Sequence, residues 1–448
     1  MACLFIIFKK NWLLMKFQIP KGLFDILPYG LNEKWKNIDY WQYVEAIIHD
    51  TARIFGFKEI RTPIFERAEL FDRGVGATSD IVSKEMYIFK DKADRSLALR
   101  PEGTSSVMRS YVENPQNFIK TPKLYYIAPM FRYERPQAGR YRQHHQFGAE
   151  VIGVKNPEQD AEIITMLWQF FEKLGLKNLE LNLNSIGDIE CRENYKAALI
   201  KFLSPAYSKL SKESQVRFEK NPLRILDSKD PDDKKLLEKA PCILDFLSLS
   251  SSEHFKQVCS FLDQIKIPYV INPNIVRGLD YYNRTVFEIL CNDLGAQSAI
   301  GAGGRYDGFT EVFGGKPQPG IGFGSGMERI IHTMISQGIL PLENTSPFIY
   351  LIPLDKKSSD FCFLMMNNLR KLKVPVDMDL EFKKIATSLQ KANQLKSRFS
   401  LVIGSNEIES NTAKLKNMFT RTEETVSLNQ LENLIKDHWE KNESTRLS

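Results

Sequence analysis

The sequence lacks the marks of several large classes of protein. Its six cysteines form no CxxC pair and have no histidine-rich neighbourhood, so zinc is not expected and free thiols indicate a reducing, cytoplasmic setting. No apolar run is long enough to cross a bilayer, so no membrane partner is expected. The formal charge is only +6, which permits a nucleic-acid partner without requiring one. A GK[ST] phosphate loop is also missing, so the chain has no generic nucleotide motif.

The first 14 residues differ from the rest of the chain. Their apolar run is short and precedes the lysines, whereas a signal peptide has the reverse order. We interpret residues 1–14 as an N-terminal extension, with Met15 beginning a more ordinary polar start. An organelle-targeting segment is the alternative, because the stretch has no acidic residue.

The chain as a whole is long enough for two or three domains with substantial cores. Of its 448 residues, 43% are hydrophobic and 26% are charged, as in ordinary globular proteins. Residues 15–187 and 269–343 are expected to form the two parts of one domain, separated by a Lys-, Glu- and Ser-rich helical insertion at 188–268. In residues 344–448, strands and helices alternate, which predicts a small α/β domain with a mainly parallel sheet.

The stretch Arg132–Gly153 (RYERPQAGRYRQHHQFGAEVIG) predicts a hairpin with a long basic tip. Alternation along its second strand places one apolar set on the core side and one polar set on the other side: His145, Phe147, Ala149 and Val151, against Arg142, His144, Gln146 and Glu150. A row of hydrogen-bonding groups on a sheet is costly unless something polar lies against it. The loop and its flanks add four guanidiniums that suit a polyanion, although a solvated basic hairpin is the alternative: Arg132, Arg135, Arg140 and Arg142.

Two segments before the hairpin carry further signals. Apolar residues at 3.6-residue spacing predict a helix over residues 35–55, followed by a strand at 57–65 that Pro63 interrupts. Because proline cannot donate to a ladder, this strand is expected at a sheet edge or a subunit boundary. Next, Glu102 and Thr104 flank a tight turn and could hold an ammonium group, whereas helix capping by Thr104 or Ser105 is the alternative.

The second half of the chain supplies three glycine-containing segments: VRGLDYYNRTVFEIL at 276–290, AIGAGGRYDG at 299–308 and GIGFGSGMERII at 320–331. The glycines allow a ligand to approach the backbone closely. An arginine near a helix start, here Arg329, suits a phosphate. Taken one at a time, these segments are equally typical of turn-rich hairpins and a surface arginine.

Taken together and in order, the motifs resemble those of the class II aminoacyl-tRNA synthetases: Pro63 in its strand, RPEGT at 100–104, FRYERPQAGRYRQHHQFGAE at 131–150 and GFGSGMER at 322–329. VRGLDYY (276–282) and GAGGRYDG (301–308) resemble the histidine-specific signature within that class. The resemblance extends from about Met15 into the C-terminal region. It implies an α+β catalytic domain on a mainly antiparallel sheet with a helical insertion, and a C-terminal α/β anticodon-binding domain.

The resemblance also implies an activity, the ATP-dependent attachment of L-histidine to its tRNA through a histidyl-adenylate. The implied ligands are ATP with Mg²⁺, histidine and histidine tRNA, in a cytoplasmic homodimer. Neither chemical step needs a protein nucleophile; both need positioning and charge stabilisation. No editing domain is visible.

The nucleotide side of the implied site can be named residue by residue. Arg277 would stabilise charge at the α-phosphate as the main catalytic residue, and Arg132 would bridge that phosphate and the substrate carboxylate. The outer phosphates and the adenine would be bound by Arg140, Arg329 and Glu134. His144 stands where the family often has phenylalanine; its ring can stack on adenine, and its protonation would make ATP affinity sensitive to pH.

The implied histidine site uses the RPEGT turn, the polar row of the hairpin and the histidine-specific loops. Glu102, Thr104 and Gln146 would take the α-ammonium, with Gly103, Arg132 and Arg277 beside them. Glu150 and Tyr282 would bind the two imidazole nitrogens, and the pocket would be completed by Tyr281 and Tyr306. Such a site rejects analogues that leave its buried groups unpaired.

Two alternatives from other classes share the fold. One is a catalytically silent paralogue that regulates ATP phosphoribosyltransferase; such proteins generally lack the anticodon domain and several substrate-binding residues. The other is a tRNA-sensing domain of a regulatory protein. The presence here of Arg132, Arg277 and Arg329 favours the enzyme.

Overall fold

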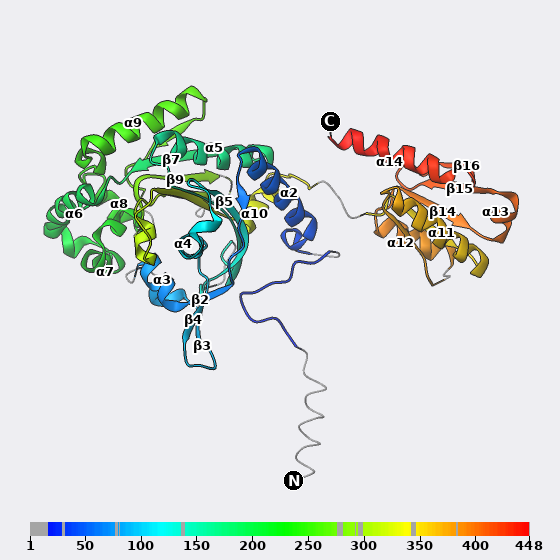
Figure 1. Cartoon of the computed structure of the whole chain (residues 1–448), viewed down its shortest axis with the longest axis horizontal. Helices are drawn as coiled ribbons and strands as arrows, with labels where there is room; N and C mark the ends of the chain where they lie inside the picture. Colours follow the sequence, from blue (N-terminus) through cyan, green and yellow to red (C-terminus); the bar gives the residue numbers. More distant parts are fainter. Residues whose placement is uncertain are drawn as a thin grey trace, which may run out of the picture. The chain divides into compact units, whose positions relative to one another are not determined.

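The computed structural model describes residues 17–28, 32–76, 79, 81–135, 139–275, 281–291, 293, 299–341, 346–381 and 384–447. The expected extension at residues 1–14 and the predicted catalytic residue Arg277 lie outside these ranges. The chain divides into two compact units, Met1–Pro341 and Leu342–Ser448 (Figure 1).

Eight strands form the central sheet of the first unit: β1 (Lys58–Glu59), β5 (Lys123–Phe131), β6 (Gln143–Ile152), β7 (Leu179–Ser185), β8 (Tyr269–Ile271), β9 (Asn283–Cys291), β10 (Ala299–Arg305) and β11 (Gly320–Gly326). Their order is β1-β5-β6-β11-β10-β9-β7-β8. All neighbours are antiparallel except β1 with β5 and β7 with β8. The predicted mainly antiparallel sheet is confirmed.

Alternation along β6 separates the two faces of this sheet, as the sequence predicts. Phe147, Ala149 and Val151 are at most 1% exposed and join the main hydrophobic core. That face is covered by three helices, which lie together in Figure 1: α2 (Ile38–Ile54), α5 (Pro157–Lys173) and α10 (Met327–Ser336). The polar residues of β6 therefore face away from the core.

Helix α2 matches the helix predicted over residues 35–55, and a short 3₁₀ helix at Lys34–Lys36 precedes it. The Asn37 side chain caps the first turn by accepting a hydrogen bond from the Asp39 amide at 2.9 Å. Trp41, Val44 and Ile48 form the buried stripe that the periodicity predicts, each at most 1% exposed.

The segment between β7 and β8 is helical and is drawn in green in Figure 1: α6 (Ile189–Leu203), α7 (Lys212–Lys220), α8 (Pro231–Leu237) and α9 (Leu249–Gln264). Helix α9 packs against α5 and β7 of the main body. Asp233 ties α7 and α8 together, because its Oδ2 accepts hydrogen bonds from the hydroxyls of Ser214 and Ser228, each at 2.6 Å.

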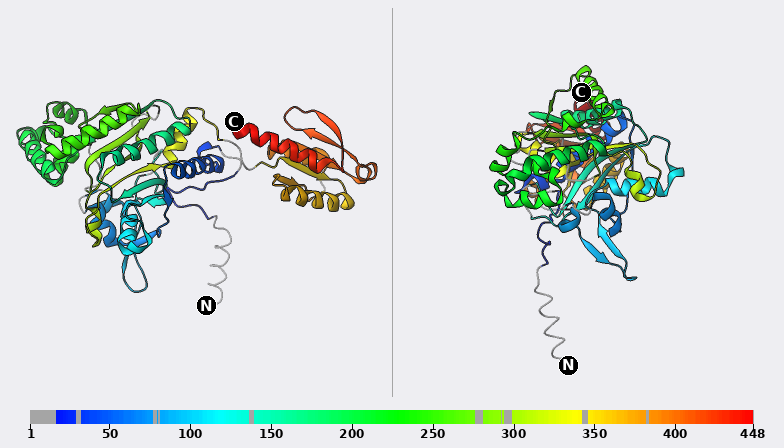
Figure 2. Two further views of the ribbon diagram at one scale, coloured as in Figure 1. Left: turned by 45° about the horizontal axis from the view of Figure 1, so that its top comes forward. Right: turned by 90° about the vertical axis from the view of Figure 1, so that its left-hand side faces the viewer.

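A small second sheet projects from the first unit (Figure 2) and has the order β2-β4-β3, with β2 at Phe65–Arg67, β3 at Ile88–Lys90 and β4 at Ser96–Leu99. Helices α3 (Ala68–Val75) and α4 (Thr104–Glu113) follow its strands. The single strand predicted at 57–65 is split around Pro63: β1 lies at the edge of the large sheet, and β2 joins the small one. Phe65 and Phe89 are 52% and 41% exposed, with ring centroids 6.0 Å apart.

The second unit is an α/β unit of five strands and four helices among its described residues: β12 (Ile349–Pro353), α11 (Lys356–Lys371), β13 (Val376–Met378), α12 (Ile385–Gln394), β14 (Phe399–Ile403), α13 (Ser405–Ser410), β15 (Thr412–Asn417), β16 (Glu423–Ser427) and α14 (Leu431–Leu447). Its sheet order is β13-β12-β14-β15-β16. β12 pairs in parallel with β13 and β14, and β15 pairs antiparallel with β14 and β16, so β15 alone among these five strands runs in the opposite direction.

The predicted α/β unit with a mainly parallel sheet is confirmed, although the antiparallel strand β15 is an addition that the sequence analysis did not predict. The antiparallel hairpin β15–β16 buries only Ala413, Leu415 and Val426, so its sequence carries too few apolar residues to reveal two strands. The sequence Ser427-x-x-Gln430 resembles a capping box that would open the last helix, but Ser427 ends β16 and α14 begins only at Leu431.

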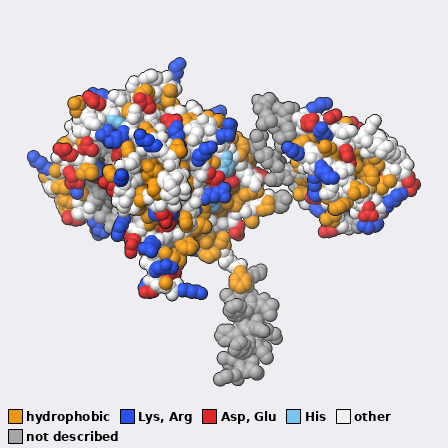
Figure 3. Space-filling model, in the orientation of Figure 1, with side chains coloured by type: hydrophobic (Ala, Val, Ile, Leu, Met, Phe, Trp, Pro, Cys, Tyr) orange, Lys and Arg blue, Asp and Glu red, His pale blue; other side chains and the backbone are white. Residues whose placement is uncertain are grey.

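No helix among the described residues is long and apolar enough to span a membrane. On the visible face of the molecule, acidic and basic side chains are interspersed (Figure 3).

Candidate active site

A cavity of about 970 Å³ is lined by the polar face of the large sheet and by the loops around it. It is lined by nearly all the site residues expected from the sequence: Glu102, Thr104, Arg132, Glu134, Arg140, His144, Gln146, Glu150, Tyr281, Tyr282, Tyr306 and Arg329. Gly103 is not among the lining residues, and Arg277 lies outside the described residues. The lining residues form two groups, which we call the carboxylate cluster (Glu102, Gln146 and Glu150 with the hydroxyls and rings around them) and the arginine cluster (Arg132, Arg140 and Arg329).

Glu150 is the centre of the carboxylate cluster and is 1% exposed. Its Oε1 accepts a hydrogen bond from the Thr104 hydroxyl at 2.7 Å, and its Oε2 accepts one from the Tyr306 hydroxyl. Burial raises the pKa of Glu150 to about 8, although both hydrogen bonds act in the opposite direction. Near neutral pH, the carboxyl group can therefore either donate or accept a proton.

The Glu102 side chain binds backbone amides at the start of α4. Its two carboxylate oxygens accept hydrogen bonds from the amides of Thr104, at 2.6 Å, and Ser105, at 2.9 Å. Helix capping by the hydroxyl of Thr104 or Ser105 is wrong, because the Thr104 hydroxyl donates to Glu150 and the Ser105 hydroxyl makes no hydrogen bond with the described residues. Burial raises the pKa of Glu102. Gly103 packs closely on a tyrosine, since a Cβ there would lie 2.3 Å from the Tyr126 ring.

Glycines in β11 leave room for the polar side chains of β6. A Cβ at Gly322 would lie 1.9 Å from Glu150 Oε2, and one at Gly324 would lie 1.9 Å from Gln146 Nε2. Gln146 Oε1 is buried and accepts no hydrogen bond from the described residues. The strand GIGFGSG therefore forms the floor of the carboxylate cluster and is not a phosphate loop, and its glycines leave room for the side chains of that cluster.

Aromatic rings form one wall beside Glu150. The ring centroids of Tyr281 and Tyr282 are 4.6 Å apart, those of Tyr281 and Tyr306 are 5.7 Å apart, and that of Phe309 lies 4.4 Å from Tyr281. Burial raises the pKa of Tyr281 and Tyr306 well above the usual value, so both phenols stay neutral hydrogen-bonding groups.

The arginine cluster is held by backbone carbonyls. Arg132 Nε donates to Pro101 O at 2.9 Å, and Arg329 Nη1 donates to Ala299 O at 2.8 Å. Burial lowers the pKa of Arg329, and repulsion from Arg140 adds to this effect. A bound polyanion would relieve that repulsion.

Glu134 and His144 lie beside the arginines. Arg140 Nη1 is 3.4 Å from Glu134 Oε2, which is buried and accepts no hydrogen bond from the described residues. Burial, followed by repulsion from Arg132, lowers the pKa of His144 well below the usual value, so its ring is neutral at pH 7. The pH sensitivity predicted for this residue is therefore expected only in acid.

Arg142 is not part of the cavity, although it lies on the predicted polar row. Its guanidinium lies 4.0 Å from the centre of the Tyr133 ring, and its Nη1 donates to Lys21 O at 3.3 Å. Sequence reasoning also missed several cavity residues of the helical segment, including Arg217, Arg224 and Lys229. Their charge run gives no signal that separates them from an ordinary solvated face.

The comparisons with known proteins agree with this geometry. A family model described as histidyl-tRNA synthetase matches residues 35–330, and an anticodon-binding-domain model matches residues 349–438. The histidine–tRNA ligase of Protochlamydia amoebophila is 52% identical over 424 residues, covering 94% of this chain and 100% of the relative. That of Desulfitobacterium hafniense is 45% identical, covering 94% and 98%. The apo S. aureus histidyl-tRNA synthetase structure matches with a TM-score of 0.78 at 36% identity, covering 94% and 100%.

An antiparallel sheet with arginines and carboxylates on one face, followed by an anticodon-binding fold, defines a class II aminoacyl-tRNA synthetase. Within that class, the match over residues 35–330 and the identity to curated relatives are specific. The chain belongs to the histidyl-tRNA synthetase family.

Proposed function

We propose that this protein activates L-histidine with ATP and transfers the histidyl group to its tRNA. The observation that carries the proposal is one cavity lined both by a buried, hydroxyl-bonded Glu150 and by a cluster of arginines. The first group suits an imidazole and the second suits a triphosphate. The cavity therefore offers a binding site for each substrate of an adenylate-forming reaction, the amino acid and ATP.

Glu150 and Tyr282 bind the two imidazole nitrogens, and Tyr281 and Tyr306 close the pocket. The raised pKa of Glu150 supports this role, because the carboxyl group can give or take the proton that either imidazole tautomer requires. A ligand without these nitrogens would leave buried polar groups unpaired, so it would bind poorly.

The α-ammonium group is held by Glu102, Thr104 and Gln146. The buried Gln146 Oε1, which accepts no hydrogen bond from the described residues, supports this assignment. Gly103 contributes through its close packing on Tyr126, which allows the turn to approach the sheet. The ammonium would thus replace water at groups that are already in position.

Arg132 bridges the histidine carboxylate and the α-phosphate, while Arg140 and Arg329 bind the outer phosphates. Glu134 accepts from the adenine edge and the neutral His144 ring stacks on the base. Arg277 remains the proposed main catalytic residue, facing the α-phosphate.

The chemistry follows from positioning rather than from a protein nucleophile. The histidine carboxylate oxygen attacks the α-phosphorus, pyrophosphate leaves, and a hydroxyl of the tRNA 3′ end then displaces AMP from the adenylate. The arginines stabilise the charge that develops on the phosphate oxygens.

Mg²⁺ would accompany the nucleotide. Among the described residues, no group of three or more His, Cys, Asp or Glu side chains is placed to hold a metal ion. A Mg²⁺ ion that accompanies a nucleotide is usually coordinated by phosphate oxygens and water. Such an ion would neutralise charge on the outer phosphates.

The tRNA contacts involve both units. The unit that contains residues 349–438 would bind the anticodon, since it matches an anticodon-binding domain. Arg217, Arg224 and Lys229 line the cavity from the helical segment and would face the acceptor end. No observation favours a silent regulatory protein, because both ligand clusters are present.

A cytoplasmic homodimer is also proposed. A protein–protein contact is supported by the short edge strand β1 and by exposed apolar residues on the small sheet and just before it: Ile64, Phe65, Ile88 and Phe89. A monomer at micromolar concentration in analytical ultracentrifugation would contradict the dimer.

Histidine-dependent ATP–pyrophosphate exchange tests the proposed function, on the wild type and on Arg277→Ala. We expect exchange with histidine alone among the amino acids, and its loss in the variant. A folded wild-type protein that binds tRNA without supporting exchange would contradict the proposal.

A further inference from the structure

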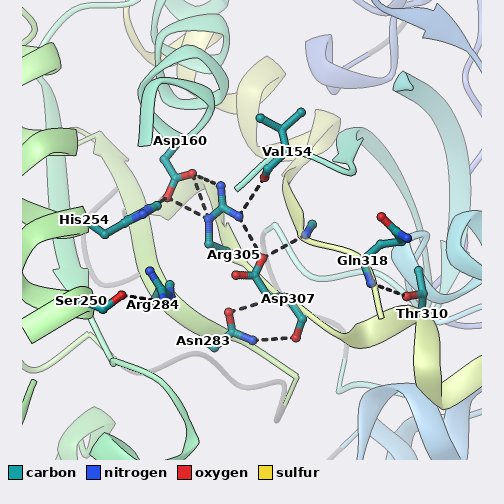
Figure 4. A network of polar contacts seen from close by, with 11 residues as sticks. Val154, Asp160, Ser250, His254, Asn283, Arg284, Arg305, Asp307, Thr310 and Gln318 are labelled. Carbon is teal, nitrogen blue, oxygen red and sulfur yellow. Dashed lines mark hydrogen bonds and ion pairs between the residues drawn. The ribbon is translucent and has the colours of Figure 1, made fainter. Parts of the chain in front are cut away.

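A buried polar network lies next to the pocket tyrosines and takes no part in the chemistry above (Figure 4). Its centre is an ion pair between Arg305, at the end of β10, and Asp160 in α5; both residues are 0% exposed. Arg305 Nε lies 3.0 and 3.2 Å from the two Asp160 oxygens. Because a buried ion pair costs much desolvation energy, it seldom adds net stability over an apolar pair. The network therefore suggests a role in geometry.

One set of hydrogen bonds in the network involves the segment that carries Tyr306. Arg305 precedes this tyrosine directly, and its Nη1 donates to Asp307 Oδ1 at 2.9 Å. The same oxygen accepts a hydrogen bond from the Gly320 amide at 3.1 Å, at the start of the glycine strand β11. One carboxylate thus fixes the loop after β10 against the strand that forms the pocket floor.

The network also reaches Tyr282. Asn283, the next residue, exchanges two hydrogen bonds with the backbone of Asp307: its Nδ2 donates to the carbonyl at 3.0 Å, and its Oδ1 accepts from the amide at 3.1 Å. The segments of Tyr282 and Tyr306 are therefore tied to each other.

Two helices of the insertion contact this assembly. His254 Nε2, from α9, lies 2.8 Å from Asp160 Oδ2. Arg192 Nη1, from α6, donates to the Tyr282 carbonyl at 2.8 Å. The helical segment that lines the cavity is thus in direct contact with the residues that hold two of the pocket tyrosines.

We propose that Asp160, His254, Asn283, Arg305 and Asp307 are positioning residues that set the geometry of the histidine pocket and make it depend on how the helical insertion is docked. The inference rests on the proposed function, because histidine is the ligand assigned to that pocket. The hydrogen bond between Tyr306 and Glu150 must be held in place for an imidazole to be recognised. Arg132 and Arg140 flank the tip of the β5–β6 hairpin, whereas the network contacts the chain just after the other end of β6, where Arg305 Nη1 donates to Val154 O at 3.0 Å. The ATP site should therefore be much less affected.

The test compares Michaelis constants for histidine and ATP in pyrophosphate exchange. Asp307→Ala removes the acceptor shared by Arg305 and Gly320, at a side chain that is 31% exposed. We expect the KM for histidine to rise about tenfold and the KM for ATP to stay within about twofold. Asp307→Asn keeps the Oδ1 acceptor and should restore most of the histidine affinity.

The contribution of the insertion is tested on α9. His254→Ala should raise the KM for histidine about fivefold, within the range of coupling between sites in proteins. His254→Gln, which can return a donor to Asp160, should reverse the effect. Gln257→Ala is the matched control, because Gln257 is an exposed residue of the same helix; it should change neither constant.

Thermal unfolding of each variant separates positioning from loss of the fold. An equal rise in both Michaelis constants, or no change in either, would overturn the inference. If Asp307→Ala does not fold, the comparison of His254→Ala with His254→Gln decides. A wild-type protein without histidine-dependent exchange would instead contradict the proposed function, so the two failures are distinguishable.

Discussion

The carboxylate cluster and the arginine cluster share one cavity but differ in solvent exposure and in electric charge. Glu102 and Glu150 are at most 3% exposed, and burial raises the pKa of both. In the arginine cluster, the Arg140 side chain is 43% exposed, and Arg140 and Arg329 repel each other. The first cluster is desolvated and internally hydrogen-bonded, whereas the second carries excess charge of one sign.

This difference explains how one cavity can select the amino acid with one group of residues and bind the nucleotide with another. Buried, prearranged hydrogen-bonding groups discriminate between ligands, because a wrong ligand leaves them unpaired. Clustered guanidiniums favour any polyanion of the right size, and they give affinity more than selectivity. We therefore assign amino-acid selection to the carboxylate cluster and nucleotide binding to the arginine cluster.

Removal of Glu150 should have the largest effect on one side of this comparison. Glu150→Ala leaves the hydroxyls of Thr104 and Tyr306 without their shared acceptor, so we expect kcat/KM for histidine to fall about a thousandfold in pyrophosphate exchange. The KM for ATP should change little. Glu158→Ala, in the first turn of α5, is the control and should behave as wild type. Equal losses for both substrates would contradict the division.

Removal of Arg329 tests the other side. Arg329→Ala should raise the KM for ATP about thirtyfold, since one charge-assisted phosphate contact is lost. The KM for histidine should stay within about threefold. Arg53→Ala, at an exposed arginine of α2, is the matched control. A larger effect on histidine than on ATP would show that the clusters are misassigned.

The pKa of Glu150 makes a prediction for stability. In the folded protein this pKa is about 8, above the ordinary value of 4.5, so the folded state holds the proton more tightly than the unfolded state. The wild type should therefore lose stability as pH rises through about 5 to 8, by roughly 3 to 4 kcal/mol relative to Glu150→Gln, since each unit of pKa difference corresponds to about 1.4 kcal/mol. Urea unfolding of both proteins across this range measures the difference. A constant difference would contradict the raised pKa.

A smaller effect is expected from filling the floor of the carboxylate cluster. Gly324→Ala places a methyl group against Gln146 Nε2, so the Gln146 side chain must move and the KM for histidine should rise about fivefold. Gly326→Ala is an internal control, because a Cβ there meets nothing within 4 Å. If both variants behave alike, the glycine spacing has no role in the pocket.

The smallest effect concerns His144. Since its pKa lies well below the usual value, the ratio of the ATP Michaelis constants of His144→Phe and wild type should be constant between about pH 7 and 9. A ratio that changes with pH in this range would show that the ring is protonated near neutrality.

Much of the polar face could be predicted from the sequence, because strand alternation is a local rule. Gln146 and Glu150 are four residues apart in one strand, so their common face follows from the pleat alone. The buried stripe of α2 follows in the same way from helical periodicity. The roles of Gly322 and Gly324 could not be predicted, since they depend on which strand pairs with β11.

The buried network could not be predicted either. Arg305 is visible in the GGRYDG motif, but its partner Asp160 is 145 residues away in the sequence. Asp160 is also separated from its other partner, His254, by 94 residues. Such contacts depend on how the helices pack on the sheet, which no periodicity encodes. The β15–β16 hairpin was missed for a different reason, because its strands bury too few residues to show a pattern.

The most direct test of the division between the two clusters is equilibrium binding of each ligand alone by calorimetry. Histidine and ATP would be titrated separately into wild type, Glu150→Ala and Arg329→Ala. We predict that Glu150→Ala loses measurable histidine binding and keeps its ATP affinity, and that Arg329→Ala shows the reverse. If either variant loses the binding of both ligands while it remains folded, the two clusters act as one site, and the division of amino-acid and nucleotide binding between them is wrong.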